Sequence, residues 1–104
     1  MKIFGSNAQW LDESILPPLI SAAEQLAVDE AMLNEAEKGL LQNSVVRTWQ
    51  AATPVVVLGS SSELLREVNY DACKRLKIPI LRRPSGGATV ILGPGCVMWS
   101  IVIP

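Results

Sequence analysis

The sequence has no histidine and only two cysteines, and these shortages exclude several classes of site. Cys73 and Cys96 stand alone, without a Cys-x-x-Cys pair or a histidine partner, so none of the familiar zinc-ligand spacings is present. Two isolated thiols also make a poor disulfide framework. We therefore expect both cysteines to be reduced, Cys73 as a small buried hydrophobe and Cys96 as an inert thiol.

The sequence also lacks long apolar runs and an excess of charge of one sign. No stretch reaches the roughly 18 apolar residues of a transmembrane helix, and the start of the chain lacks the apolar core of a secretory signal. Nine basic and ten acidic residues give a net charge of −1, which provides no general attraction to nucleic acid or to a membrane. We expect a cytoplasmic protein that binds neither.

Apolar residues, in contrast, make up 49% of the chain. A chain of 104 residues forms one domain at most and buries only roughly 60–70% of its unfolded surface, so the excess suits a buried sheet or a surface that something else covers. Residues 96–103 are largely apolar on both faces, which is an aggregation hazard at a sheet edge. We therefore expect residues 1–104 to be the N-terminal portion of a longer domain or one half of a split enzyme.

Local patterns predict alternating helices and strands. A capping box of Ser21 and Glu24 begins a helix over residues 22–38. Residues 45–50 alternate in polarity and residues 55–58 are apolar on both faces, and we predict that these two strands pair as a hairpin. The further predicted elements are a short helix over 63–67, a helix over 70–77 capped by Asn69, and strands over 78–82, 90–92 and 96–103.

One acidic residue falls on the inward face of the first predicted helix. Asp29 shares an apolar arc with Leu26 and Leu33, and a carboxylate there costs several kcal/mol unless it is paired or hydrogen-bonded. Two kinds of partner are open. Asp29 either accepts hydrogen bonds from backbone N–H groups of a nearby loop, or it holds Arg82 or Arg83 in position beside a ligand.

Residues 82–90, Arg-Arg-Pro-Ser-Gly-Gly-Ala-Thr-Val, gather the most unusual chemistry in the chain. They lie between two apolar runs, so we expect a bend between two strands. Adjacent glycines allow positive φ and the close approach of a ligand, and their N–H groups can converge on an anionic oxygen beside an arginine fork. The pattern indicates an anion or carboxylate site, with an ordinary hairpin turn and two solvated arginines as the alternative.

This motif resembles the Arg-Arg-x-Ser/Thr-Gly-Gly signature of the lipoate–protein ligase and octanoyltransferase family, which is related to biotin–protein ligases. The likeness continues in order along the chain, through Leu-Ala-Val-Asp-Glu-Ala at 26–31, Arg-Thr-Trp-Gln at 47–50, Pro-Val-Val-Val-Leu-Gly at 54–59 and Asn69. The resemblance implies an α/β fold with a mixed, mainly antiparallel sheet and packed helices, as an incomplete domain of the class II synthetase and biotin-ligase type.

The resemblance also implies a function. Lipoate, or a related medium-chain acyl group, would be activated with ATP and Mg²⁺ as an acyl adenylate and attached to a lysine of a lipoyl-carrier domain, of 2-oxoacid dehydrogenase or glycine-cleavage type. No metal site is expected in the chain itself. The residues assigned to substrate binding are Val28 and Trp49 beside the acyl tail, with Arg83, Ser85, Gly86, Gly87, Ala88 and Thr89 at the carboxyl or acyl-phosphate oxygens, and those assigned to positioning are Asp29 and Arg82. For Trp49, plain core packing is an equal alternative.

Two departures from the family pattern leave other functions open. The family usually continues to Gly-Ala-Val-aromatic-His-Asp after the glycines, whereas residues 88–93 read Ala-Thr-Val-Ile-Leu-Gly. The activating lysine of the ligases and the nucleophilic cysteine of the transferases lie further along the domain than Pro104, so no catalytic residue is assigned here and we expect the isolated chain to be inactive. The alternatives are an octanoyl or lipoyl transferase that uses a carrier-protein thioester and a non-catalytic acyl- or adenylate-binding module.

Overall fold

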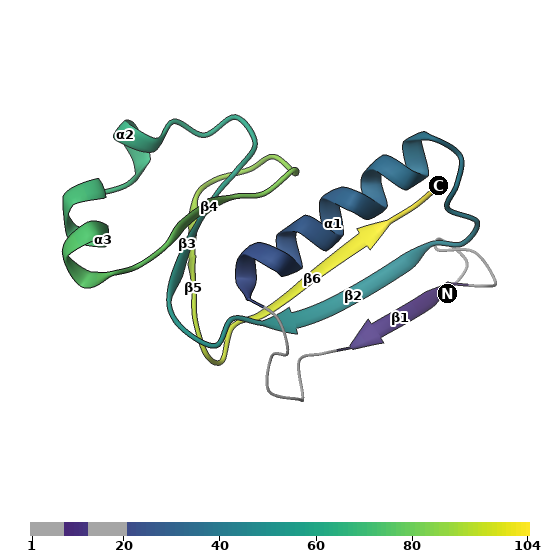
Figure 1. Cartoon of the computed structure of the whole chain (residues 1–104), viewed down its shortest axis with the longest axis horizontal. Coiled ribbons are helices and arrows are strands. Elements are labelled where there is room, and N and C mark those ends of the chain that lie inside the picture. The colour runs from purple at the N-terminus through teal and green to yellow at the C-terminus, as the bar shows by residue number, and fades with distance from the viewer. Residues whose placement is uncertain (1–7, 13–20) are drawn as a thin grey trace.

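The computed structural model describes residues 8–12 and 21–104, arranged around two small sheets (Figure 1). The mixture of helices with parallel and antiparallel strands confirms the predicted α/β class. The elements in chain order are β1 (Gln9–Asp12), α1 (Ala22–Glu37), β2 (Val45–Gln50), β3 (Val55–Leu58), α2 (Leu64–Glu67), α3 (Tyr70–Leu76), β4 (Ile80–Arg82), β5 (Val90–Leu92) and β6 (Val97–Val102).

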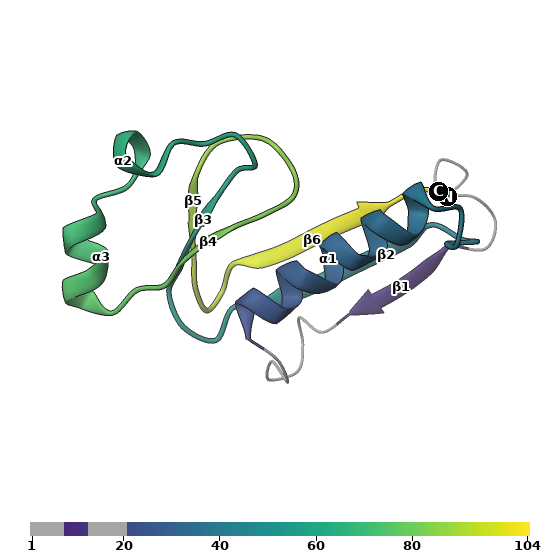
Figure 2. The same ribbon diagram turned by 45° about the horizontal axis from the view of Figure 1, so that its top comes forward.

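The first sheet has the strand order β1-β2-β6. β2 runs parallel to β1 and antiparallel to β6, in a register that sets Arg47 opposite Ser100 and Trp49 opposite Met98. α1 lies along one face of this sheet, as Figures 1 and 2 show from two directions. Alternate residues of β2 and β6 therefore point toward the helix.

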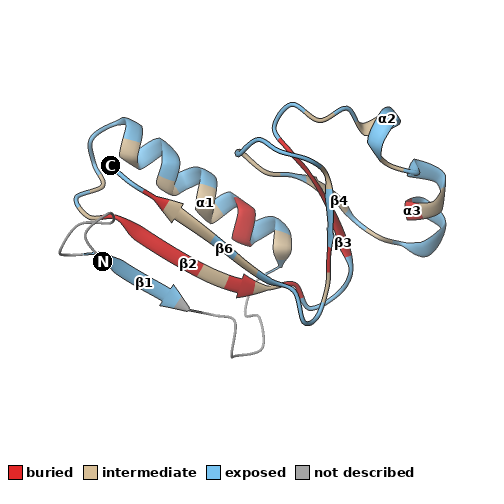
Figure 3. Ribbon diagram, turned by 180° about the vertical axis from the view of Figure 1, so that it is seen from behind, coloured by how far each residue is buried: buried red, intermediate tan, exposed pale blue. Residues whose placement is uncertain are grey.

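The second sheet has the order β4-β3-β5, with β4 parallel and β5 antiparallel to the central strand. All four residues of β3 are buried, as expected for a strand that is apolar on both faces. α2 and α3 lie at the end of the molecule away from α1 (Figures 1 and 2). Burial is concentrated in β2 and β3 (Figure 3).

The predicted hairpin between residues 45–50 and 55–58 is wrong, because the two strands belong to different sheets. Instead, β2 pairs with β6 and β3 pairs with β5, so the chain forms one antiparallel ribbon that bends between its two legs. At the bend Gly95 adopts a φ of +93°, and its N–H donates to Gln50 Oε1 at 3.0 Å. Sequence alternation identified the strands, whereas the bend decided their partners.

The predicted helix signals are confirmed. Ser21 Oγ accepts a hydrogen bond from the Glu24 N–H, and the Glu24 carboxylate accepts one from the Ser21 N–H, both at 3.2 Å. Asn69 caps α3 by accepting from the Ala72 N–H at 3.0 Å. Within the described ranges, no helix is long and apolar enough to cross a membrane. The core that α1 covers consists of Leu26, Trp49, Ala51, Val55, Val57 and Leu92.

Candidate functional site

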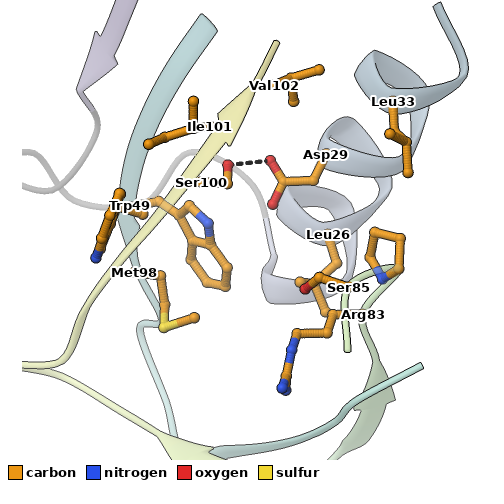
Figure 4. Close-up of a pocket in the computed structure, with 12 residues that line it drawn as sticks. Leu26, Asp29, Leu33, Trp49, Arg83, Ser85, Met98, Ser100, Ile101 and Val102 are labelled. Carbon is orange, nitrogen blue, oxygen red and sulfur yellow. Dashed lines mark hydrogen bonds between the residues drawn. The ribbon is translucent and has the colours of Figure 1, made fainter. Parts of the chain in front are cut away.

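A cavity of about 200 Å³ lies where α1, β6 and the chain after β4 meet (Figure 4). Most of its wall is apolar, and the side chains with polar groups are Asp29, Arg83, Ser85 and Ser100, together with the indole N–H groups. The lining residues are Leu26, Asp29, Leu33, Trp49, Arg83, Pro84, Ser85, Met98, Trp99, Ser100, Ile101 and Val102. The motif singled out in the sequence therefore opens onto an apolar cavity.

Residues 83–89, called the glycine loop below, are held in shape by the Arg83 guanidinium. Arg83 donates to the carbonyl oxygens of Gly86 and Ala88, both at 2.9 Å, and to that of Val57 at 3.3 Å. A guanidinium has five N–H donors, so these three bonds leave two for a ligand. Because Arg83 also lines the cavity, the same side chain can hold the loop in shape and bind an anion at the same time.

Four carbonyl oxygens of the glycine loop are paired within the protein. Carbonyl oxygens of Ser85, Gly86, Gly87 and Ala88 all accept hydrogen bonds from the protein, those of Ser85 and Gly87 from Ser60 N–H and Ser62 Oγ. Within residues 8–12 and 21–104, no acceptor is paired with the N–H groups of residues 86–88. Donors without a protein acceptor are what an oxyanion site requires.

The alternative of an ordinary hairpin turn is wrong, because β4 and β5 lie on opposite sides of β3. The loop instead crosses over the end of β3 and packs on Gly59. A Cβ on Gly59 would overlap the Gly87 carbonyl oxygen and lie 3.1 Å from its carbon. Gly87 itself has a φ of +102°, which a glycine adopts without strain. These two glycines permit the crossing.

Arg82 is the last residue of β4 and, unlike Arg83 just after it, contacts the segment that follows β3. Arg82 donates to the carbonyl oxygens of Gly59 at 2.7 Å, Ser60 at 3.3 Å and Ser62 at 2.8 Å. It does not line the cavity. Arg82 therefore holds residues 59–62 in place through their backbone carbonyl oxygens, and the glycine loop packs on this segment.

Asp29 has neither of the partners predicted from the sequence. Its Oδ1 pairs with the Arg47 guanidinium and accepts a hydrogen bond from Ser100 Oγ at 2.8 Å. Arg47 also donates to the Gln25 carbonyl oxygen at 3.1 Å and to its side-chain oxygen. Sequence reasoning missed Arg47 as the partner, although its position between Val45 and Trp49 on the inward face of β2 was the available signal.

The remaining predicted residues are distributed around the cavity rather than gathered in it. Trp49 is 1% exposed and belongs both to the buried core and to the cavity wall. Val28 is half-buried on α1 and is not part of the lining. Ser85 lines the cavity, while residues 86–88 are exposed next to it.

Thr89 closes the far end of the glycine loop. Its hydroxyl donates to Glu67 Oε1 at 3.0 Å, and Oε2 of the same carboxylate accepts from the Glu63 N–H at 2.9 Å. These hydrogen bonds lower the pKa of Glu67, and the one from the Glu63 N–H is the stronger cause.

Cys73 is buried and Cys96 exposed, both as free thiols, and no cluster of potential metal ligands occurs in the described part of the chain.

An apolar cavity lined at one end by Arg83 and Ser85 of the glycine loop has the chemistry that suits a molecule with an apolar tail and an anionic head. Residues 21–104 match the family model of the lipoyl protein ligase A/B catalytic domain. The chain belongs to this family of lipoate–protein ligases and octanoyltransferases.

Curated relatives include both activities of the family. The octanoyltransferase LipM of Carboxydothermus hydrogenoformans is 35% identical over 68% of this chain and 26% of its own length. A protein of Aeropyrum pernix, provisionally named lipoate-protein ligase A, is 35% identical over 76% of this chain and 29% of its own. An octanoyl-[GcvH]:protein N-octanoyltransferase of Geobacillus kaustophilus is 31% identical over 90% and 33%. The chain thus spans about a quarter to a third of these relatives.

Solved structures share the fold. LipL1 of P. falciparum in complex with lipoate superposes with a TM-score of 0.75 at 16% identity, over 91% of this chain and 30% of that chain. A lipoate-protein ligase A bound with ATP gives 0.71 at 24%, over 92% and 36%. A bi-partite lipoate protein ligase from Thermoplasma acidophilum, described with its E2 lipoyl domain, gives 0.65 at 18%, over 92% and 34%.

Proposed function

We propose that this chain is the acyl-binding portion of a lipoate–protein ligase, with the acyl tail in the cavity and its carboxyl group on the glycine loop. The observation that carries the proposal is that the apolar cavity and the glycine loop meet. Arg83 and Ser85 line the apolar cavity, and the neighbouring N–H groups of residues 86–88 have no described protein acceptor. The overall reaction is the ATP-dependent attachment of lipoate, or a related medium-chain acyl group, to a carrier lysine.

The chemistry that the loop supports is stabilisation of negative charge. Arg83 would neutralise the carboxylate and later the acyl-phosphate oxygens with its two remaining N–H groups. The backbone N–H groups would donate to the carbonyl oxygen as the lysine amine attacks, and such a donor contributes about 3–4 kcal/mol to the transition state. Buried Trp49 and Leu26 would exclude water from the acyl chain.

The described residues suit the binding of ATP better than that of Mg²⁺. The glycine loop and Arg83 suit the phosphate next to the acyl carbon, and a ligase of this fold is known with ATP bound. The described residues hold no group of three or more acidic, cysteine or histidine side chains. We therefore assign no Mg²⁺ ligand among the described residues.

A second candidate is the transfer of an octanoyl or lipoyl group from a carrier-protein thioester, because several curated relatives are named octanoyltransferases. The same loop would then hold the thioester oxygen, and ATP would not be needed. A non-catalytic acyl- or adenylate-binding module would keep the cavity without either reaction.

The partners we propose follow from the same relatives. Carrier domains of the glycine-cleavage and 2-oxoacid dehydrogenase types are the acceptors that we propose. A ligase of this fold is described with its E2 lipoyl domain, and the name of one relative gives octanoyl-GcvH as its acyl donor. We also propose that residues 1–104 act in the cytoplasm as the N-terminal portion of one catalytic domain. The activating lysine or nucleophilic cysteine would come from the rest of that domain or from a second subunit.

Titration of the purified chain with lipoate, octanoate and lipoyl-AMP tests the acyl-binding role. Trp49 and Trp99 are the fluorescence reporters, because both line the cavity, and Trp10 is replaced by phenylalanine. We expect saturable binding, tightest for lipoyl-AMP, and no adenylate formation from lipoate and ATP by this chain alone. Absence of binding by all three ligands would overturn the proposal. The two activities are separated by adding the rest of the catalytic domain and measuring acyl transfer to a carrier lysine with and without ATP. A ligase needs ATP, whereas a transferase does not.

A further inference from the structure

The cavity has two ends, and the function proposed above uses only one of them. Arg83 and Ser85 lie at the end formed by the glycine loop, whereas Leu33 and Val102 lie at the opposite end (Figure 4). Leu33 is 40% exposed, although it lines the cavity. Its side chain therefore stands between the cavity and the solvent, where it can limit how far a bound molecule extends.

The geometry of helix and strand places Leu33 and Val102 at the same level. α1 and β6 run in the same direction (Figure 1), and a hydrogen bond of 2.8 Å between Asp29 and Ser100 sets their register. Leu33 is four residues beyond Asp29, which is about 6 Å along a helix. Val102 is two residues beyond Ser100, which is about 7 Å along a strand. The two apolar side chains thus close the cavity from opposite walls.

The length of the cavity suits an acyl chain of medium length. Leu26 and Leu33 line it from α1 and are seven residues apart, a distance of about 10 Å along the helix. Ser85, beside which the carboxyl group would bind, lies level with Leu26 in Figure 4. An extended acyl chain gains about 1.25 Å per C–C bond, so an octanoyl chain is about 9 Å long. Its methyl group would therefore reach Leu33, and further carbons would fit only if that side chain moved.

The affinity for acids of increasing length depends on whether Leu33 is such a limit. Each methylene group that leaves water for an apolar cavity should increase the affinity roughly fourfold. A carbon that reaches Leu33 must either displace this side chain or stay in water. Displacement costs free energy, as at other overpacked sites, and a carbon in water gains nothing. The gain per carbon should therefore stop at the length that reaches Leu33.

We propose that Leu33, together with Val102, closes the far end of the cavity and limits the acyl group to a saturated chain of about eight carbons. This proposal rests on the proposed function, because it takes the carboxyl group of the ligand to lie at Arg83. It makes Leu33 a residue that determines specificity, on a different element from the glycine loop, and it excludes long-chain fatty acids as substrates.

A series of unbranched acids tests the proposal on the unmodified chain. Dissociation constants are measured for hexanoate, octanoate, decanoate and dodecanoate, each below its micellar concentration. We expect octanoate to bind about tenfold more tightly than hexanoate. Decanoate and dodecanoate should bind no more tightly than octanoate. An affinity that continues to rise through dodecanoate would overturn the proposal.

The variant Leu33→Ala should remove the limit. Decanoate and dodecanoate should bind it about tenfold more tightly than they bind the unmodified chain, while the affinity for hexanoate should stay the same because this acid ends before Leu33. The matched control is Leu40→Ala, since Leu40 is 66% exposed and does not line the cavity. The control should keep the limit at octanoate. A Leu33→Ala protein that still shows this limit contradicts the proposal.

The variant Leu33→Phe changes the limit in the opposite direction. The larger side chain shortens the cavity, so octanoate should lose about tenfold in affinity while hexanoate binds as before. A merely structural role of Leu33 would weaken the binding of all acids equally and would not change the preferred length. Circular dichroism reports whether each variant folds, and the series on the unmodified chain decides if neither does.

The two proposals fail in different ways. If octanoate binds and the affinity rises without a break through dodecanoate, the role of Leu33 is refuted and the acyl site stands. If none of the acids binds, both the acyl site and the length limit built on it are refuted.

Discussion

Asp29 of α1 and Arg47 of β2 form an ion pair between the helix and the sheet, with side chains only 14% and 4% exposed. The pair joins residues 18 positions apart in the sequence and fixes α1 over the strand that carries Trp49. Breaking one side of such a pair leaves a buried charge without a partner, which is more costly than removing both.

Arg47→Met should therefore destabilise the chain by about 3–5 kcal/mol, measured by urea denaturation. The double variant Arg47→Met with Asp29→Leu should recover most of that loss, because neither charge is then buried alone. Equal stability losses in the single and double variants would contradict this account of the pair.

Gly59→Ala should displace the glycine loop from its position on residue 59. The added methyl group would overlap the Gly87 carbonyl oxygen, so either the loop or the end of β3 must move. We expect at least a tenfold loss of lipoate affinity and a stability loss of about 1–3 kcal/mol, in the range of other overpacked sites. The matched control is Gly93→Ala, where the nearest atom is 3.9 Å away, and it should bind lipoate normally.

Arg83→Lys should impair ligand binding more than folding. Arg83 holds two loop carbonyl oxygens through one nitrogen and still has N–H groups for an anion, which a lysine ammonium cannot reproduce. We expect the lipoate dissociation constant to rise about tenfold or more with little change in the melting temperature. The exposed Arg75 provides the control, since Arg75→Lys changes the same chemistry away from the site. Unchanged affinity in Arg83→Lys would exclude Arg83 as an anion ligand.

The link between Thr89 and Glu67 should be visible in a pH titration. Hydrogen bonds from the Glu63 N–H and the Thr89 hydroxyl lower the pKa of Glu67, so this contribution to stability is present above the pKa of the unfolded chain. It is lost as the pH falls through the lowered pKa of the folded chain. Thr89→Val should raise the pKa of Glu67 in an NMR titration, and Thr89→Ser, which keeps the hydroxyl, should not.

Self-association of the purified chain should depend on Trp99. Among the described strands β6 is at the edge of its sheet, and Trp99 on it is 65% exposed. Trp99→Lys places a charge on this edge, which disfavours pairing between edges. Light scattering at increasing concentration should show less association than for Leu65→Lys, a control on α2. Equal association in both variants would mean that β6 is not the surface involved.

The amino-acid sequence alone was sufficient to predict several features of this protein. The capping box at Ser21 and Glu24 and the Asn69 cap set two helix starts, because capping depends on neighbours within one turn. The composition of residues 82–90 singled out the loop that lines the cavity through Arg83 and Ser85. The family followed from the same motif, which the comparison with known proteins confirms.

The tertiary structure alone decided which distant groups meet. The bend near Gly95 directs β3 and β5 into a second sheet, and no local pattern distinguishes that arrangement from a hairpin between residues 45–50 and 55–58. Asp29 meets Arg47 and, 71 positions away, Ser100, because α1 crosses β2 and β6 where their registers coincide. Sequence periodicity states which side of an element a residue occupies, whereas its partner there depends on the packing of whole elements, which is a property of the complete fold.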